Sequence, residues 1–154
     1  MACASPKAPT GGERDTKPPA IIESASTPNK QTNFQEKEIT ITFDEWTTLK
    51  DIYTQLVISP LMPHAPEIKQ KGKGIVIKLP DSLRANTTYT INFGNAIADL
   101  NEGNILENYA FIFSTGNVLD SIRLSGNVTY AFTLKPADGA WVMLYPVNED
   151  SAVY

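Results

Sequence analysis

Residues 83–116 read LRANTTYTINFGNAIADLNEGNILENYAFIFSTG, and this stretch is the most informative part of the chain about the fold. Its segment TYTINF, residues 88–93, alternates polar and apolar residues, the period-2 pattern of a half-buried strand. Residues 99–104, DLNEGN, have the composition of a turn, and residues 109–114 form a second strand that is apolar on both faces. The stretch therefore predicts an antiparallel β-structure and offers no nucleophile, base or metal cage.

Further strands are predicted on both sides of this stretch. The segment at residues 38–43 alternates cleanly, with Ile39, Ile41 and Phe43 facing inward. Residues 49–56 predict one or two helical turns, and residues 26–31 a loop. The remaining predicted strands are residues 20–24, 57–59, 67–71 and 74–79, the last two forming a hairpin. About seven short strands in roughly 100 residues are typical of an immunoglobulin-like sandwich.

Several short motifs also resemble those of a bacterial Ig-like domain of the S-layer-protein type. The motifs are Leu83, residues 86–89, Ile97 with Asp99, residues 102–104, Phe111 and residues 113–116, and, nearer the N-terminus, residues 17–22 and 39–45. The resemblance covers about residues 17–116. It implies an all-β, Ig-like antiparallel β-sandwich of about seven strands, and we set the domain at residues 18–116.

Composition excludes several classes of protein. The chain has 154 residues, 42% of them hydrophobic, which is enough for one core and part of a second domain. No apolar run approaches the length of a membrane span. The net charge of −4 argues against nucleic acid as a partner, because phosphate binding requires a basic surface.

Cys3, the only cysteine, precedes a polar run rich in proline, ASPKAPTGGERDTKPP. This composition predicts an extended, disordered tether over residues 1–17. The leader resembles that of Bacteroidota-type lipoproteins, which implies lipidation of Cys3 and an anchor in the outer membrane. The alternative is a surface thiol without a role. The membrane face is undecided, although no acidic run directly follows Cys3, which favours the periplasmic side.

Residues 117–154 predict the truncated start of a second β-module. Two strands are predicted, at residues 121–130 and 140–147, with Pro136 and Asp138 in the loop between them. The segment resembles the opening of a carboxypeptidase-regulatory or transthyretin-like module. Because 38 residues are too few for an independent core, we expect a hairpin with open edges.

The residue inventory does not predict an enzyme. His64 is the only histidine and is expected in an exposed, proline-flanked loop. Asp44 and Glu45 are adjacent, and adjacent strand residues point to opposite faces, so they do not form the facing pair that a glycosidase needs. We predict no catalytic residue and no cofactor.

Two further features suggest ligands, each with a simpler alternative. Asp99, Asn101, Glu102 and Asn104 form a weak calcium candidate, but Ala110 stands where an EF-type loop needs glutamate. The alternative is a turn in which asparagine and glycine adopt positive φ angles. Trp46 and Trp141 are candidates for glycan contact, although Trp46 is expected in core or edge packing.

Three Asp-Ser-aliphatic tripeptides match the O-glycosylation motif found with such lipoproteins. Their acceptors are Ser82, Ser121 and Ser151. Ser121, between the two modules, is the best candidate because an acceptor must be exposed.

The combined prediction is a non-catalytic structural or interaction module of a cell-envelope lipoprotein. It acts as a spacer or docking domain in an outer-membrane assembly, with a protein partner. The alternatives are a surface polysaccharide-binding module and an accessory domain of an enzyme whose catalytic part lies beyond residue 154.

Overall fold

The computed structural model describes residues 12–121, 125–140 and 142. The chain divides into two compact units, Met1–Asp120 and Ser121–Tyr154, which are described separately. Of the predicted tether, the structure describes residues 12–17, all of which are exposed. Here Arg14 donates to the Glu102 carbonyl (3.4 Å) and Asn104 donates to the Asp15 carbonyl (3.2 Å).

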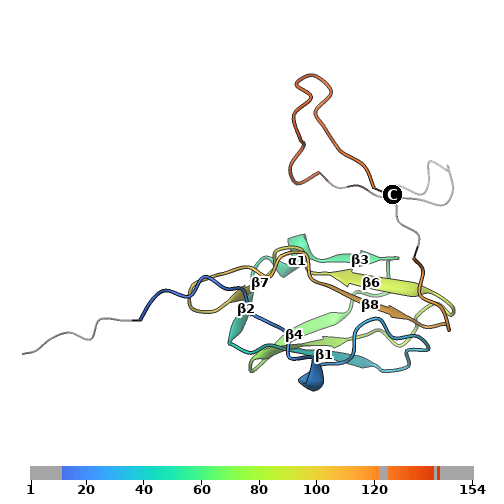
Figure 1. Ribbon diagram of the computed structural model, residues 1–154. Coiled ribbons are helices and arrows are strands. Elements are labelled where there is room, and N and C mark those ends of the chain that lie inside the picture. Colours follow the sequence, from blue (N-terminus) through green and yellow to red (C-terminus); the bar gives the residue numbers. More distant parts are fainter. Residues whose placement is uncertain (1–11, 122–124, 141, 143–154) are drawn as a thin grey trace, which may run out of the picture. The chain divides into compact units, whose positions relative to one another are not determined.

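The first sheet has three antiparallel strands in the order β1-β5-β4 (Figure 1). They are β1 (Glu38–Thr42), β4 (Glu67–Lys71) and β5 (Gly74–Lys78). The alternation in β1 places Ile39 and Ile41 in the core with no exposed surface, as predicted. The predicted hairpin is confirmed as β4 and β5, which pair from Lys71↔Gly74 to Glu67↔Lys78.

The second sheet has the order β3-β6-β8 and is also antiparallel. It contains β3 (Val57–Ser59), β6 (Thr88–Asn92) and β8 (Ala110–Ser114). The last two are the strands of the 83–116 stretch, paired from Thr88↔Ser114 to Asn92↔Ala110. A separate antiparallel pair consists of β2 (Thr47–Leu49) and β7 (Ile97–Asp99), neither of which was predicted as a strand.

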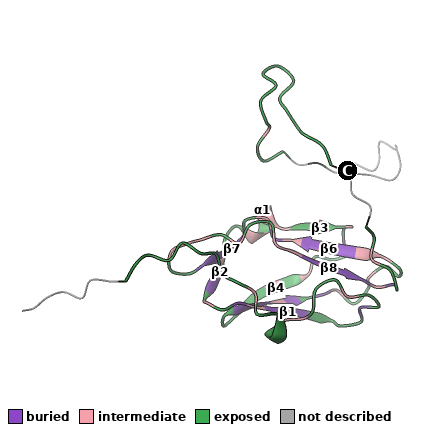
Figure 2. Ribbon diagram, viewed as in Figure 1, coloured by how far each residue is buried: buried purple, intermediate pink, exposed green. Residues whose placement is uncertain are grey.

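The core lies between the two larger sheets and is mostly isoleucine and phenylalanine (Figure 2). Phe113 is its aromatic centre, with ring centroids 4.5 Å from Phe34 and 5.4 Å from Tyr89. The buried Tyr89 hydroxyl accepts the Arg84 N–H at 2.9 Å, so its polar group does not lie unpaired in the core. The described residues contain eight short strands around this core, and the predicted antiparallel β-sandwich is confirmed.

Two short helical turns complete this unit. Residues 52–55 form α1 (Ile52–Gln55), within the predicted helical segment. The strand predicted at residues 20–24 is wrong, because this segment contains the 3-10 helix η1 (Glu23–Ala25) and keeps only one β-bridge, Ile21↔Phe43. Serine and threonine side chains explain the difference: Ser26 Oγ accepts the Thr42 N–H, and Thr27 Oγ1 accepts the Thr40 N–H, in place of a regular ladder.

Residues 20–34 form a segment that we call the N-terminal strap. Its first half bonds to the free edge of β1, through Ile22 N–H to Thr42 O and Thr27 N–H to Thr40 O (both 2.8 Å). Its second half bonds to the free edge of β8, where Lys30 N–H donates to Ile112 O (2.8 Å). The strap therefore covers one edge of each sheet and joins the two layers.

The second unit has little regular structure in its described part. Thr129 and Pro136 form an isolated bridge, with Ala137 N–H donating to Val128 O (3.0 Å). The strand predicted at residues 121–130 is absent from the described residues 125–130. Residues 128–130 instead pair with residues 135–137, which lie in the segment predicted as a loop. This local pairing closes a shorter loop than pairing between residues 121–130 and 140–147 would, so it costs less conformational entropy. The predicted second strand, residues 140–147, lies mostly outside the described residues.

Candidate functional site

The predicted modification sites fall in different parts of the chain. Cys3 and Ser151 lie outside the described residues, as does Trp141. Ser82 and Ser121 are both exposed, which an O-glycosylation acceptor requires. His64 is exposed in the loop between β3 and β4.

The Asp99 turn is built around one buried carboxylate. Asp99 Oδ1 accepts the N–H groups of Glu102 (2.6 Å) and Gly103 (2.9 Å), and Oδ2 accepts that of Asn104 (2.8 Å). Burial opposes ionisation of this carboxyl, but the backbone N–H donors hold the pKa of Asp99 below its usual range. Both oxygens thus stabilise the turn, and the described residues contain no group of three or more His, Cys, Asp or Glu placed to hold a metal.

Trp46 and Leu100 form an exposed apolar surface beside this turn, which we call the Trp46–Leu100 patch. The Leu100 N–H donates to the Trp46 carbonyl (2.9 Å), and the two residues are 55% and 58% exposed. Trp46 was expected in core or edge packing: the core position is wrong, and the residue lies instead at the end of the β2–β7 pair. The β2–β7 pair ends here, and its short ladder leaves both side chains uncovered.

Carboxylates surround the Trp46–Leu100 patch. Partial burial raises the pKa of Glu45, and the negative charges of Asp99, Asp44, Asp15 and Glu102 raise it further. Three basic side chains reach the same end of the domain: Lys73 Nζ donates to the Asp44 carbonyl (2.6 Å), Arg14 donates to the Glu102 carbonyl, and Lys50 Nζ lies beside Gly103. The patch is thus an apolar centre with a charged rim in which acidic groups predominate.

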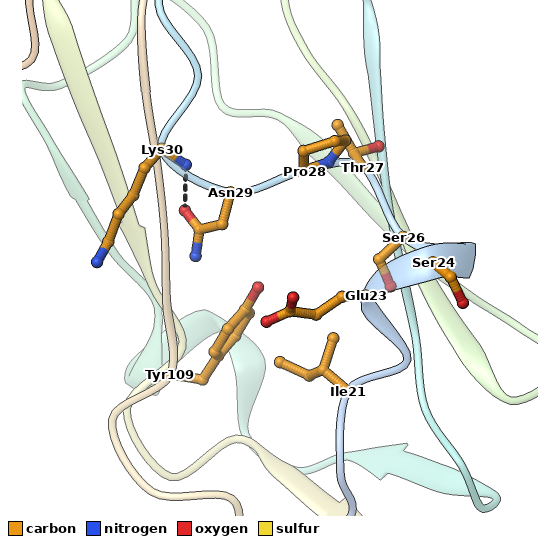
Figure 3. Close-up of a pocket in the computed structure, with 9 residues that line it drawn as sticks. All are labelled: Ile21, Glu23, Ser24, Ser26, Thr27, Pro28, Asn29, Lys30 and Tyr109. Carbon is orange, nitrogen blue, oxygen red and sulfur yellow. Dashed lines mark hydrogen bonds between the residues drawn. The ribbon is translucent and has the colours of Figure 1, made fainter.

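A pocket of about 600 Å³ with mixed polar and apolar walls lies between the strap and the start of β8 (Figure 3). Its lining combines residues of the strap with one aromatic ring: Ile21, Glu23, Ser24, Ser26, Thr27, Pro28, Asn29, Lys30 and Tyr109. The sequence did not predict this site. Glu23 and Tyr109 are 86 residues apart in the chain (109 − 23), and no motif connects them.

Tyr109 is held firmly in the pocket wall. Its ring stacks on Phe93, with ring centroids 6.0 Å apart and planes inclined by 25°. Burial raises the pKa of Tyr109 to about 12; the Asn29 side chain opposes this shift and the Glu23 charge adds to it. Figure 3 shows the Glu23 carboxylate directed toward Tyr109, whereas the Lys30 side chain points away from both.

Comparisons with known proteins agree with this architecture. The family model for the bacterial Ig-like domain matches residues 15–115. No curated protein and no solved structure matches the chain. No helix among the described residues is long and apolar enough to cross a bilayer. With its sandwich fold and a family match over most of its length, the chain belongs to the bacterial Ig-like domain family.

Proposed function

We propose that this protein is a non-catalytic Ig-like module of a cell-envelope lipoprotein that acts as a spacer or docking domain in an outer-membrane assembly. Cys3 would carry the lipid anchor, and residues 4–11 would connect it to the domain. Family membership supports the module part of this proposal by analogy, because many cell-surface domains share the Ig-like sandwich architecture.

The Trp46–Leu100 patch is the observation that carries the docking role. Tryptophan is enriched at the centres of protein interfaces, where a large ring leaves water on binding. In the described part of the first unit, Trp46 and Leu100 are neighbours that each keep more than half of their surface exposed. Their charged rim resembles the usual anatomy of an interface, an apolar centre with a polar border.

The position of the patch relative to the tether also supports docking near a membrane. Arg14 and Asp15 contact Glu102 and Asn104, in the turn that follows Leu100. The chain therefore enters the domain at the same end as the patch. If Cys3 is anchored, this end is the one held nearest the membrane, where other envelope proteins are concentrated.

The experiment is a cross-linked pull-down of the full-length protein from its native membrane, analysed by mass spectrometry. The proposal predicts a stoichiometric outer-membrane partner that is lost with the double variant Trp46→Ser/Leu100→Ser and retained with Tyr53→Ser. Tyr53 is a suitable control because it is an aromatic residue that is 99% exposed outside the patch. Cys3→Ser, which removes the anchor atom, is expected to release the protein from the membrane fraction.

Recovery of background proteins alone would contradict the docking role. It would favour the polysaccharide-binding alternative, for which a glycan-binding screen is the next step. Retention of Cys3→Ser in the membrane fraction would contradict the lipid anchor independently of docking.

A further inference from the structure

We propose that the pocket between Glu23 and Tyr109 receives the side chain of a lysine or an arginine from a protein partner. The cation would pair with the Glu23 carboxylate, and its alkyl stem would pack against Ile21 and the Tyr109 ring. This goes beyond the docking role by assigning a second contact and its chemistry, and it rests on that role only in placing the cation on a protein.

Three polar side chains of the pocket wall, those of Ser26, Thr27 and Asn29, are already used by the fold. Asn29 Nδ2 donates to Ala110 O (2.9 Å), and Asn29 Oδ1 accepts the N–H groups of Lys30 and Ile112 (both 2.8 Å). Ser26 Oγ donates to Ile22 O and accepts the Thr42 N–H (both 2.8 Å). These bonds fix the shape of the wall and engage the donor groups of Ser26 and Asn29.

The Glu23 carboxylate, in contrast, is available. Among the described residues, the ion pairs are Lys37–Asp81 and Lys69–Glu67, and neither includes Glu23. Glu23 is exposed on η1, and its side chain points into the pocket toward Tyr109 (Figure 3). The pocket thus offers a free negative acceptor beside an aromatic ring.

This combination favours a cation over a neutral, hydroxyl-rich ligand such as a sugar. A sugar needs both donors and acceptors from its site, and the Ser26 and Asn29 groups are engaged with the backbone. An ammonium or guanidinium group needs acceptors only, and it is attracted to the electron-rich aromatic ring as well. Lysine and arginine also carry apolar stems that fit beside Ile21 and Pro28.

The pocket has the size and rigidity for such an anchor. Its volume of about 600 Å³ exceeds that of a single long side chain, so the residues flanking the cation would also find room. One wall is the Tyr109 ring, supported from behind by Phe93, and the other is the strap, bonded to β1 and β8. A rigid site loses little entropy on binding.

The positive charge of Lys30 leads to a second prediction, opposite in sign to the one for Glu23. Lys30 lines the pocket but points away from Glu23, so it leaves the carboxylate free while adding a positive charge nearby. Removal of this charge should strengthen the binding of a cation, and removal of the Glu23 charge should weaken it.

The test uses the full chain and two probes of equal shape, N-acetyl-arginine methylamide and its uncharged counterpart N-acetyl-citrulline methylamide. Binding is followed by the NMR shifts of the Tyr109 ring, which the Tyr109→Phe spectrum identifies. The arginine probe should give saturable shifts that Glu23→Gln weakens about three- to fivefold and Lys30→Gln strengthens about twofold. Glu36→Gln, an exposed carboxylate outside the pocket, is the matched control and should change nothing.

Equal shifts from the two probes would overturn the proposal. It would also be overturned if Glu23→Gln and Glu36→Gln lowered the affinity for the arginine probe equally. Absence of a saturable shift up to about 50 mM probe would overturn it as well, since even a single charged contact is detectable there. These outcomes concern the pocket alone. The pull-down described above tests docking through the Trp46–Leu100 patch, so each proposal can fail without the other.

Discussion

The two sides of the sandwich protect their sheet edges by different means. On one side, the strap bonds to the free edges of β1 and β8 and places Phe34 in the core. On the other side, β3 and β4 each pair with one neighbour among the described strands. There β3 has only three residues and is followed by Pro60, and β4 carries Lys69 and Lys71. A covered edge adds stability, whereas a short or charged edge only discourages unwanted pairing.

The largest expected loss of stability follows removal of the Phe34 side chain, which anchors the strap in the core. Phe34 is 6% exposed and packs against Phe113 with the two rings tilted by 39°, so Phe34→Ala should lower the free energy of unfolding by about 3–5 kcal/mol. Met62, in the loop between β3 and β4, is 9% exposed and anchors the other side. Met62→Ala should cost less, about 2–3 kcal/mol. Urea unfolding measures both values, and a larger cost for Met62→Ala would show that the strap is not the better anchored side.

A smaller effect is expected when the strap is released from β8. Asn29→Ala removes three hydrogen bonds and should cost about 1–3 kcal/mol. Because the Ile112 N–H donates to Asn29, its hydrogen exchange should accelerate more than that of Ile75 in the central strand β5. Asn95→Ala, a surface change outside the strap, is the control. Unchanged exchange at Ile112 would contradict the role assigned to the strap.

The Tyr109 phenol should make the strap side sensitive to alkali. Folding raises its pKa from 10.0 to about 12, so the folded state favours the neutral phenol. The resulting stability is fully present below pH 10 and is lost as the pH rises from 10 to 12. In an ultraviolet titration, wild type minus Tyr109→Phe should show one tyrosine that ionises near pH 12. A difference curve centred at pH 10 would contradict burial of this ring.

The smallest effect on stability is expected at the edge of the first sheet that β4 forms. Lys69→Val/Lys71→Val changes exposed residues of β4, so the free energy of unfolding should change by no more than about 0.5 kcal/mol. Self-association should nevertheless increase with concentration, because the edge loses its repelling charges. Analytical ultracentrifugation measures this, with Lys78→Val on the central strand β5 as the control. If the double variant associates no more than Lys78→Val, charge does not protect this edge.

Sequence patterns predicted the elements whose burial alternates. The strands β1, β5 and β6 each follow such a pattern, and their apolar residues line the core. The strand β8 was predicted instead as a run that is apolar on both faces, and its Phe111 and Phe113 are buried in the core. In contrast, β7 is buried at all three positions, and β2 has only three residues, so neither has a readable period. Their pairing depends on partners about 50 residues apart, which local patterns do not contain.

The candidate surfaces were harder to predict than the core. An apolar residue in a sequence favours burial, and Trp46 was therefore expected in core or edge packing, whereas it is 55% exposed. The pocket depends on Glu23 meeting Tyr109, which follows from the path of the strap across both sheets. The strap in turn depends on side-chain bonds from Ser26, Thr27 and Asn29 that replace strand pairing. Such bonds follow from the tertiary structure and not from a sequence period.

The central claim is that the domain docks through the Trp46–Leu100 patch, and site-specific photocrosslinking tests it most directly. A photoreactive phenylalanine analogue replaces Trp46 in one variant of the full-length protein and Tyr53 in another, and cells that produce each variant are irradiated. Docking through the patch should give an adduct of one discrete mass at position 46 and none at position 53, because both positions are exposed but only the first lies in the patch. The same adducts at both positions, or no adduct at position 46, would contradict it.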